Sequence, residues 1–211
     1  MGRIEAVLSD FGGVLTSPLR DTFRAFQDSS GISLASLGSA MAAVAARTGA
    51  HPLFELETGR LTEADFLAGL AAELTEQLGR TVELHGFGEA YFNHLEPNER
   101  MIEYMRALRG RGHRMAICTN NVREWEPLWR AMLPVDEIFE VVVDSAFVGV
   151  RKPEPEIYRL TLERLGVNAD TALLVDDVEA NCDGARELGM PAVWFRSTEQ
   201  AIEDIEAVLA S

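Results

Sequence analysis

The sequence predicts a doubly wound α/β fold with a mainly parallel, five-stranded sheet and a helical insertion after the first strand. Short apolar runs rich in Val, Ile and Leu do not alternate cleanly with polar residues, which is typical of strands buried on both faces of a parallel sheet. In the second half of the chain these runs alternate with helical patterns, as in a doubly wound sheet. A chain of 211 residues has room for one such core and a small inserted domain.

The predicted elements of the core follow one another in a regular order. Strands are expected at Ile4–Ser9, Arg114–Cys118, Val141–Val143, Ala172–Val175 and Pro191–Phe195. Helices are expected at Met101–Arg111, Glu124–Met132, Pro155–Leu165, Asn181–Leu188 and Glu199–Leu209. The last of these helices begins with Ser197 and Gln200 at the spacing of a capping box.

The stretch from residue 17 to residue 95 interrupts this alternation, because it contains no convincing strand. Helices are expected there at Asp21–Gln27, Leu34–Thr48, Leu53–Thr58, Glu63–Glu73 and Phe87–His94. A helical block of this length is too long for an ordinary connection between two strands. We therefore predict an α/β core formed by residues 1–16 and 96–211, with residues 17–95 as a helical cap over the carboxyl ends of the strands.

Composition narrows the classes of partner and location. The chain has 19 basic and 34 acidic residues, so its net charge of −15 argues against nucleic acid or an anionic membrane as a partner. Cys118 and Cys182 lie in apolar surroundings without CxxC spacing, which is typical of free thiols in a reducing compartment. No signal-peptide pattern or membrane-spanning stretch is evident, and we expect a cytoplasmic protein that is a monomer or a homodimer.

Acidic residues stand at the ends of two predicted strands. Asp10 follows the first apolar run and opens a Phe-Gly-Gly turn, and Asp176 and Asp177 follow the fourth run. The carboxyl ends of strands are where open α/β sheets bind ligands. If the two strands are neighbours the carboxylates converge, and converging carboxylates repel one another unless a hard cation such as Mg²⁺ lies between them.

Three further patterns carry polar side chains to the same expected edge. Thr119 and Asn120 follow the second strand, Lys152 precedes Pro153 in a proline-rich loop, and Asn181 lies shortly after the acidic pair. Each pattern also has an ordinary structural explanation, namely helix capping for the first, an exposed loop lysine for the second and acids at a helix start for the acidic pair. Their order and positions at strand ends make a shared site the better interpretation.

Together these patterns resemble the four motifs of the haloacid dehalogenase superfamily. The segments that carry the resemblance are Asp-Phe-Gly-Gly-Val-Leu-Thr, Arg-Lys-Pro-Glu-Pro-Glu-Ile-Tyr and Val-Asp-Asp-Val-Glu-Ala-Asn. Their wording is similar to one branch, which contains the N-terminal phosphatase domain of soluble epoxide hydrolases and small sugar-phosphate phosphatases. The resemblance covers the whole chain and implies a Rossmann-like core with a cap inserted after the first motif.

The resemblance implies a role for each residue. Asp10 would attack phosphorus and form an aspartyl phosphate. Asp10, the main-chain carbonyl of Gly12 and Asp177 would bind Mg²⁺, with Asp176 reaching it through water. The phosphoryl oxygens would be bound by Thr119, the Asn120 amide and Lys152, and Asn181 would support the metal shell or the lysine. The expected activity is Mg²⁺-dependent hydrolysis of a small soluble phosphorylated metabolite.

One departure from the family pattern leaves alternatives open. Most phosphatases of the superfamily have an acid–base Asp two positions after the nucleophile, where this chain has Gly12. The chain is then a phosphatase without that help, a metal-independent 2-haloacid dehalogenase, or a catalytically weak protein that binds a phosphate ligand. An interaction module that uses the cap is a further alternative. Trp125 and Trp129, four residues apart on a predicted helix, are interpreted as packing residues.

Overall fold

A computed structural model describes residues 3–18, 27–28, 30–84 and 87–211 of the chain. Its sheet has five parallel strands in the order β3-β2-β1-β4-β5, which confirms the predicted fold class. The strands are β1 (Ala6–Ser9), β2 (Arg114–Thr119), β3 (Val141–Asp144), β4 (Ala172–Asp176) and β5 (Ala192–Trp194). The central strand β1 pairs with β2 on one side and β4 on the other, with Ala6 opposite Arg114 and Ala172.

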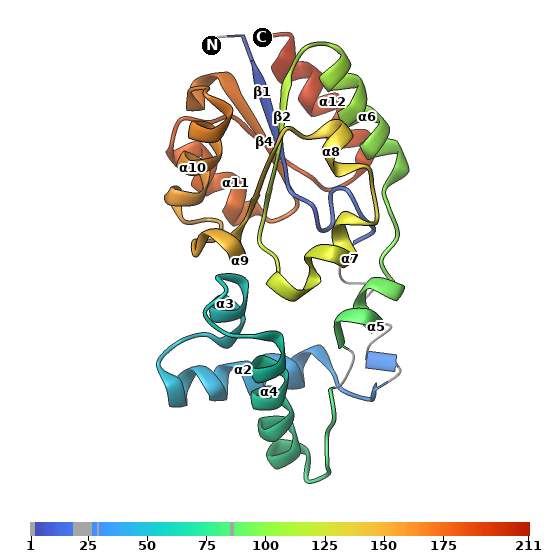
Figure 1. Ribbon diagram of the computed structural model, residues 1–211, viewed down its shortest axis with the longest axis vertical. Helices are drawn as coiled ribbons and strands as arrows, with labels where there is room; N and C mark the ends of the chain where they lie inside the picture. Colours follow the sequence, from blue (N-terminus) through green and yellow to red (C-terminus); the bar gives the residue numbers. More distant parts are fainter. Residues whose placement is uncertain (1–2, 19–26, 29, 85–86) are drawn as a thin grey trace.

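Helices cover both faces of the sheet (Figure 1). On one face lie α6 (Glu99–Gly110), α7 (Glu126–Arg130), α8 (Val135–Ile138) and α12 (Thr198–Leu209). On the other lie α10 (Pro155–Leu165) and α11 (Glu179–Glu187), with the short α9 (Ser145–Val148) after β3. Successive β1 side chains enter the two cores in turn, because Val7 packs on the α6 side while Ala6 and Leu8 pack on the α10 side.

The insertion forms a third packed unit beyond the carboxyl ends of the strands (Figure 1). It contains α2 (Leu34–Thr48), α3 (Pro52–Glu57), α4 (Glu63–Leu78) and α5 (Phe87–Asn93). Its own core includes Leu37, Phe66, Leu70 and Leu74. The predicted helix Asp21–Gln27 lies almost wholly outside the described residues.

The chain leaves and re-enters the α/β part at two points that lie side by side. Thr16 and Pro97 form an antiparallel bridge, and the Ser17 main-chain N–H donates to the Glu96 carbonyl at 2.7 Å. The predicted boundaries at residues 16 and 96 fall beside this bridge, and the division into two domains stays a prediction.

The structure differs from the predicted elements at the end of α4, which continues to Leu78 instead of ending at Glu73, and where helices are short. The expected helix Glu124–Met132 is divided into a 3-10 turn, Arg123–Trp125, and α7, with Pro127 in the first turn of α7. The four-residue helices α8 and α9 were not predicted, because one helical turn gives no apolar period to detect. In the described part of the chain, no helix has both the length and the apolar character that a membrane crossing requires.

Candidate active site

Three carboxylates meet at the carboxyl edge of the sheet. Asp10 follows β1, Asp176 ends β4 and Asp177 comes next. Because β1 and β4 are parallel neighbours, their ends coincide, and the Asp10 main-chain N–H donates to the Val175 carbonyl at 2.9 Å. One oxygen from each of the three carboxylates lies within 4.8 Å of the others, so the cluster predicted from the sequence is formed.

Lys152 is buried between two of these carboxylates. Its Nζ lies 2.8 Å from Asp10 Oδ1 and 2.6 Å from Asp176 Oδ2, with 1% of the lysine side chain exposed. Burial alone disfavours the charged ammonium, but the two carboxylates outweigh it and hold the pKa of Lys152 well above its ordinary value. The lysine is therefore a fixed positive charge beside Asp10, not an exposed loop residue.

Asp176 has a partner at each oxygen. Its Oδ2 accepts from Lys152, and its Oδ1 accepts from the Val178 N–H and from Asn181 Nδ2, each at 2.9 Å. Its side chain is completely buried. These contacts orient the lysine and leave Asp177, which is half-buried, as the more accessible member of the acidic pair.

Thr119 and Asn120 lie on the other side of Asp10, at the end of β2. Thr119 is buried, and both residues line the cavity above the sheet edge. The Asn120 side chain forms two hydrogen bonds with the main chain of Lys152. Its Oδ1 accepts from the Lys152 N–H at 2.8 Å, and its Nδ2 donates to the Lys152 carbonyl at 3.0 Å. Both ends of the Asn120 side-chain amide are therefore occupied by Lys152.

The charge balance of the cluster fits a divalent cation. Burial raises the pKa of Asp10 to about 6, with Asp176 adding to the shift and Lys152 opposing it. Burial and the neighbouring carboxylates raise the pKa of Asp177 to about 7. When the pKa of a carboxyl group lies this far above its ordinary value, too little positive charge is present around it to stabilise the carboxylate. Carboxylate oxygens are hard ligands of the kind that Mg²⁺ binds.

The two glycines after Asp10 have different roles. Gly13 has a φ of +75°, and a Cβ there would lie 2.3 Å from Asp177 Oδ2, so a side chain would enter the space beside the carboxylates. Gly12 is not among the described glycines with positive φ, and it is partly exposed at the cavity wall. The turn therefore requires a glycine at position 13, whereas the backbone at position 12 is not in the left-handed region that favours glycine.

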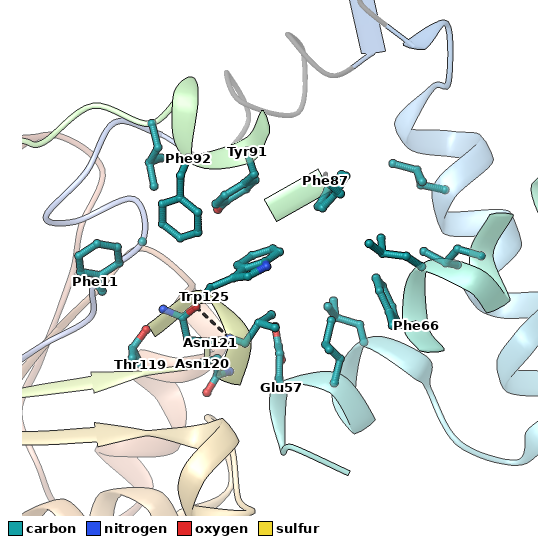
Figure 2. A pocket seen from close by; sticks show the side chains of 18 of the residues that line it. Phe11, Glu57, Phe66, Phe87, Tyr91, Phe92, Thr119, Asn120, Asn121 and Trp125 are labelled. Atoms are coloured by element: carbon teal, nitrogen blue, oxygen red, sulfur yellow. Dashed lines mark hydrogen bonds between the residues drawn. The ribbon is translucent and has the colours of Figure 1, made fainter. Parts of the chain in front are cut away.

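A cavity of about 300 Å³ opens above the sheet edge, between the core and the inserted helices (Figure 2). Asp10, Thr119 and Asn120 lie at its base. The sequence did not identify three other lining residues, Glu57, Tyr91 and Trp125, because two come from the insertion and Trp125 was interpreted as packing. That interpretation is confirmed for both residues, because Trp129 is fully buried in the core and Trp125 packs against the core and against the insertion. Trp125 also lines the cavity, which the sequence did not predict. The sequence feature that could have placed Trp125 at the site is its position shortly after the end of β2, because open α/β sheets bind ligands at the carboxyl ends of their strands.

Arg151 joins the insertion to the loop that carries Lys152. Its Nε lies 2.7 Å from Glu57 Oε2, and its guanidinium lies 4.0 Å from the centre of the Phe54 ring. Burial raises the pKa of Glu57, while Arg151 opposes the shift. Glu57 thus faces the cavity as a partly buried, ion-paired carboxylate.

Comparisons with known proteins find hydrolases and phosphatases that resemble this chain. A model of the haloacid dehalogenase-like hydrolase family matches residues 4–189. A glyceraldehyde 3-phosphate phosphatase of Pyrococcus abyssi is 41% identical over 92 residues, which are 42% of this chain and 38% of that protein. The chain therefore spans less than half the length of this relative. A phosphatase of Mycobacterium tuberculosis is 30% identical over 151 residues, or 70% of this chain and 68% of that protein.

The fold also matches solved structures. A haloacid dehalogenase family enzyme of Bacteroides thetaiotaomicron, in complex with magnesium and inorganic phosphate, aligns with a TM-score of 0.70. The alignment covers 92% of this chain and 96% of that chain at 22% sequence identity, so it establishes the likeness of the fold alone.

Proposed function

The chain belongs to the haloacid dehalogenase-like hydrolase family, and we propose that it is a Mg²⁺-dependent phosphomonoester hydrolase that acts on a small phosphorylated molecule through an aspartyl phosphate at Asp10. The observation that carries this proposal is the meeting of Asp10, Asp176 and Asp177 with the buried Lys152 at one edge of the sheet. Relatives named as phosphatases, and a structural neighbour that contains magnesium and phosphate, support it.

The metal would be held by Asp10, the Gly12 carbonyl and Asp177. Asp176 would act through water, because its two oxygens already accept hydrogen bonds from Lys152, Val178 and Asn181. When bound, Mg²⁺ would offset the negative charge of the phosphoryl group beside three carboxylates. We retain, as part of the proposal, a core of residues 1–16 and 96–211 and a cap of residues 17–95.

Asp10 would supply the nucleophilic oxygen. Lys152 holds Oδ1, so Oδ2 would attack phosphorus, forming an Asp10–phosphorus bond while the bond from phosphorus to the ester oxygen breaks. The Lys152 ammonium, the Thr119 hydroxyl and the Asn120 main-chain N–H would bind the phosphoryl oxygens. Water would then attack phosphorus, and the break of the Asp10–phosphorus bond would release inorganic phosphate and restore the carboxylate.

The departing alkoxide needs a proton in the first step, and Gly12 cannot donate one. Among the described residues that line the cavity, Glu57 is the carboxylic acid other than Asp10. Its ion pair with Arg151 favours the charged form, which is a poor proton donor. We therefore expect phosphate esters with good leaving groups to react much faster than esters of simple alcohols.

The dehalogenase alternative is weaker. Halide leaves without a proton, so Gly12 is compatible with that reaction, but the reaction needs no metal. The adjacent acids Asp176 and Asp177, with raised pKa at Asp10 and Asp177, favour an activity that uses a cation. A protein that only binds phosphate would need no nucleophile placed beside a buried lysine.

Release of inorganic phosphate from a generic aryl phosphate tests the proposal. Activity should require Mg²⁺, disappear with a chelator and be absent from Asp10→Asn. If a chelator leaves turnover unchanged and the protein releases halide from a 2-haloacid, the protein is a dehalogenase and the proposal is wrong. Phosphate binding without any turnover of the aryl ester would leave the binding-protein alternative.

A further inference from the structure

The cavity above Asp10 has a polar base and an apolar upper part. The polar lining groups are the side chains of Asp10, Thr119, Asn120 and Asn121 at the sheet edge, Glu57 from α3, and the hydroxyl of Tyr91 from α5. The remaining described lining groups are apolar or aromatic, apart from Gly12; those from the insertion are Leu37, Met41, Leu53, Leu56, Phe66, Leu67, Leu70, Leu84, Phe87, the ring of Tyr91, Phe92 and Leu95. A group attached to a phosphoryl placed at Asp10 would therefore extend into apolar surroundings.

Aromatic rings form one wall of this cavity, close to the sheet edge (Figure 2). Trp125 stacks on Tyr91 with ring centres 5.0 Å apart, and it meets Phe92 edge to face at 5.6 Å. Its Nε1 donates to Glu63 Oε1 at 2.8 Å, which fixes the indole ring against the insertion. The wall is held in place before a ligand enters.

Gly88 allows α5 to lie close to the indole ring of Trp125. A Cβ at Gly88 would lie 2.5 Å from Trp125 Nε1 and 2.9 Å from Glu63 Oε1. Only a residue without a side chain lets α5 pass over the indole while its hydrogen bond to Glu63 is kept.

The described lining of the cavity carries no positive charge. Among residues 3–18, 27–28, 30–84 and 87–211, no lysine or arginine lines it. The Lys152 ammonium below the cavity contacts Asp10 and Asp176, and the Arg151 guanidinium contacts Glu57 and Phe54. A second phosphate or a carboxylate on the leaving group would be desolvated here without a cationic partner among the described residues, and the hydroxyl groups of a sugar would lose hydrogen bonds to water.

From these observations we propose that the substrate is a phosphomonoester whose leaving group is uncharged and apolar, and that its hydrocarbon part lies between Trp125 and the leucines of the insertion. A phenol ester should react faster than an alcohol ester of the same size, because no acid protonates the departing alkoxide. This inference rests on the proposed phosphatase function. An engineered cavity of about 150 Å³ admits benzene, so the 300 Å³ here hold a phosphoryl group and an apolar group about as large as one aromatic ring.

A series of straight-chain alkyl phosphates isolates this effect, because the leaving-group pKa is nearly constant while the apolar area grows. For the wild-type protein with Mg²⁺, kcat/KM should rise about fourfold for each added methylene until the cavity is full. Glycerol phosphate and glyceraldehyde 3-phosphate serve as hydroxylated counterparts of the propyl ester, and both should be poorer substrates than it.

Alkylphosphonates give a readout that does not depend on turnover, because their phosphorus–carbon bond is not hydrolysed. Calorimetry should show the dissociation constant falling about fourfold per methylene in the same range of chain length. If the aryl phosphate test fails while the phosphonates behave in this way, the proposed function is wrong and the apolar site remains.

Two methionines provide matched variants. Met41, on α2, lines the cavity, whereas Met132 is similarly half-buried against the core and does not line it. Met41→Gln places an amide of similar length on the cavity wall, and the preference for hexyl over ethyl phosphate should fall about tenfold. Met132→Gln should leave this preference unchanged while reporting the general effect of the same substitution.

The inference is overturned if the wild-type protein hydrolyses the aryl phosphate but kcat/KM and phosphonate affinity stay flat or fall with chain length. Preference for glyceraldehyde 3-phosphate over propyl phosphate would overturn it as well. Equal losses of hexyl preference in the two methionine variants would show that Met41 does not contact the alkyl chain and would also count against it.

Discussion

Gly12→Asp is the substitution that most directly tests the chemistry proposed here. Position 12 lies two residues after Asp10 and at the cavity wall, and its backbone is not in the left-handed region. A carboxyl group placed there would join Asp10 and Asp177, whose pKa values are already raised to about 6 and about 7. Its own pKa should rise for the same reason, so part of it would be protonated near pH 7 and able to donate.

The expected increase in kcat follows from the general acid catalysis that Gly12 cannot provide. General acid catalysis typically contributes about 10²–10⁴-fold, so we expect at least a 100-fold increase in kcat for alkyl phosphates, about 3 kcal/mol of barrier. Aryl phosphates should change by less than about threefold, because a phenolate leaves without a proton.

The assay compares kcat across phosphate esters whose leaving groups differ in pKa. The wild-type protein should show a steep dependence, and Gly12→Asp a shallow one. Gly12→Asn is the matched control, since it has the same shape and donates no acidic proton, and its profile should remain steep. A shallow dependence in the wild-type protein would refute the reasoning, because another group, with Glu57 as the first candidate, would then already supply the proton. Gly13→Ala should lower activity instead, since its Cβ would lie 2.3 Å from Asp177 Oδ2.

Three further predictions concern single carboxylates. Asp10→Asn should abolish phosphate release and keep a cooperative thermal transition; activity equal to wild type without deamidation would rule out the covalent step. Asp177→Ala should weaken Mg²⁺ binding measured by calorimetry more than Asp176→Ala, whereas Asp176→Ala, which leaves Lys152 without one of its partners, should lower the melting temperature more. Burial raises the pKa of Asp144 from 3.8 to about 7, so its stabilising contribution is complete below pH 3.8 and is lost as the pH rises to 7. The wild-type protein should lose up to about 4 kcal/mol of unfolding free energy in that interval through this group, and Asp144→Asn should lack this loss; parallel pH profiles in urea titrations would contradict the assignment.

The strands and the cluster of carboxylates at their ends were predictable because local patterns specify them. The apolar run before Asp10 and the run before Asp176 each identify a strand, and parallel pairing brings their ends together. The predicted bounds of the helices Leu34–Thr48 and Pro155–Leu165 agree with α2 and α10, since Ser33 caps the first and Pro155 starts the second.

The cavity could not be predicted in the same way. Its walls combine α2 to α5 with the loop after β2, and these segments are distant in the sequence. The pattern of a helix states that one face is apolar but not whether that face meets a neighbouring helix or an open space. Trp125 illustrates the difficulty, because its spacing from Trp129 is equally compatible with a core position, and only the folded chain shows that its ring lines the cavity.

Arg151 and Lys152 are adjacent in the chain but hold opposite sides of the site. The first contacts Glu57 and Phe54 of α3, and the second contacts Asp10 and Asp176. One planar peptide group joins the two residues, so a displacement of α3 that moves Arg151 also moves the main-chain nitrogen of Lys152, whose N–H donates to Asn120. The attachment of α3 to the core and the position of the lysine between two carboxylates therefore depend on the same short stretch of main chain.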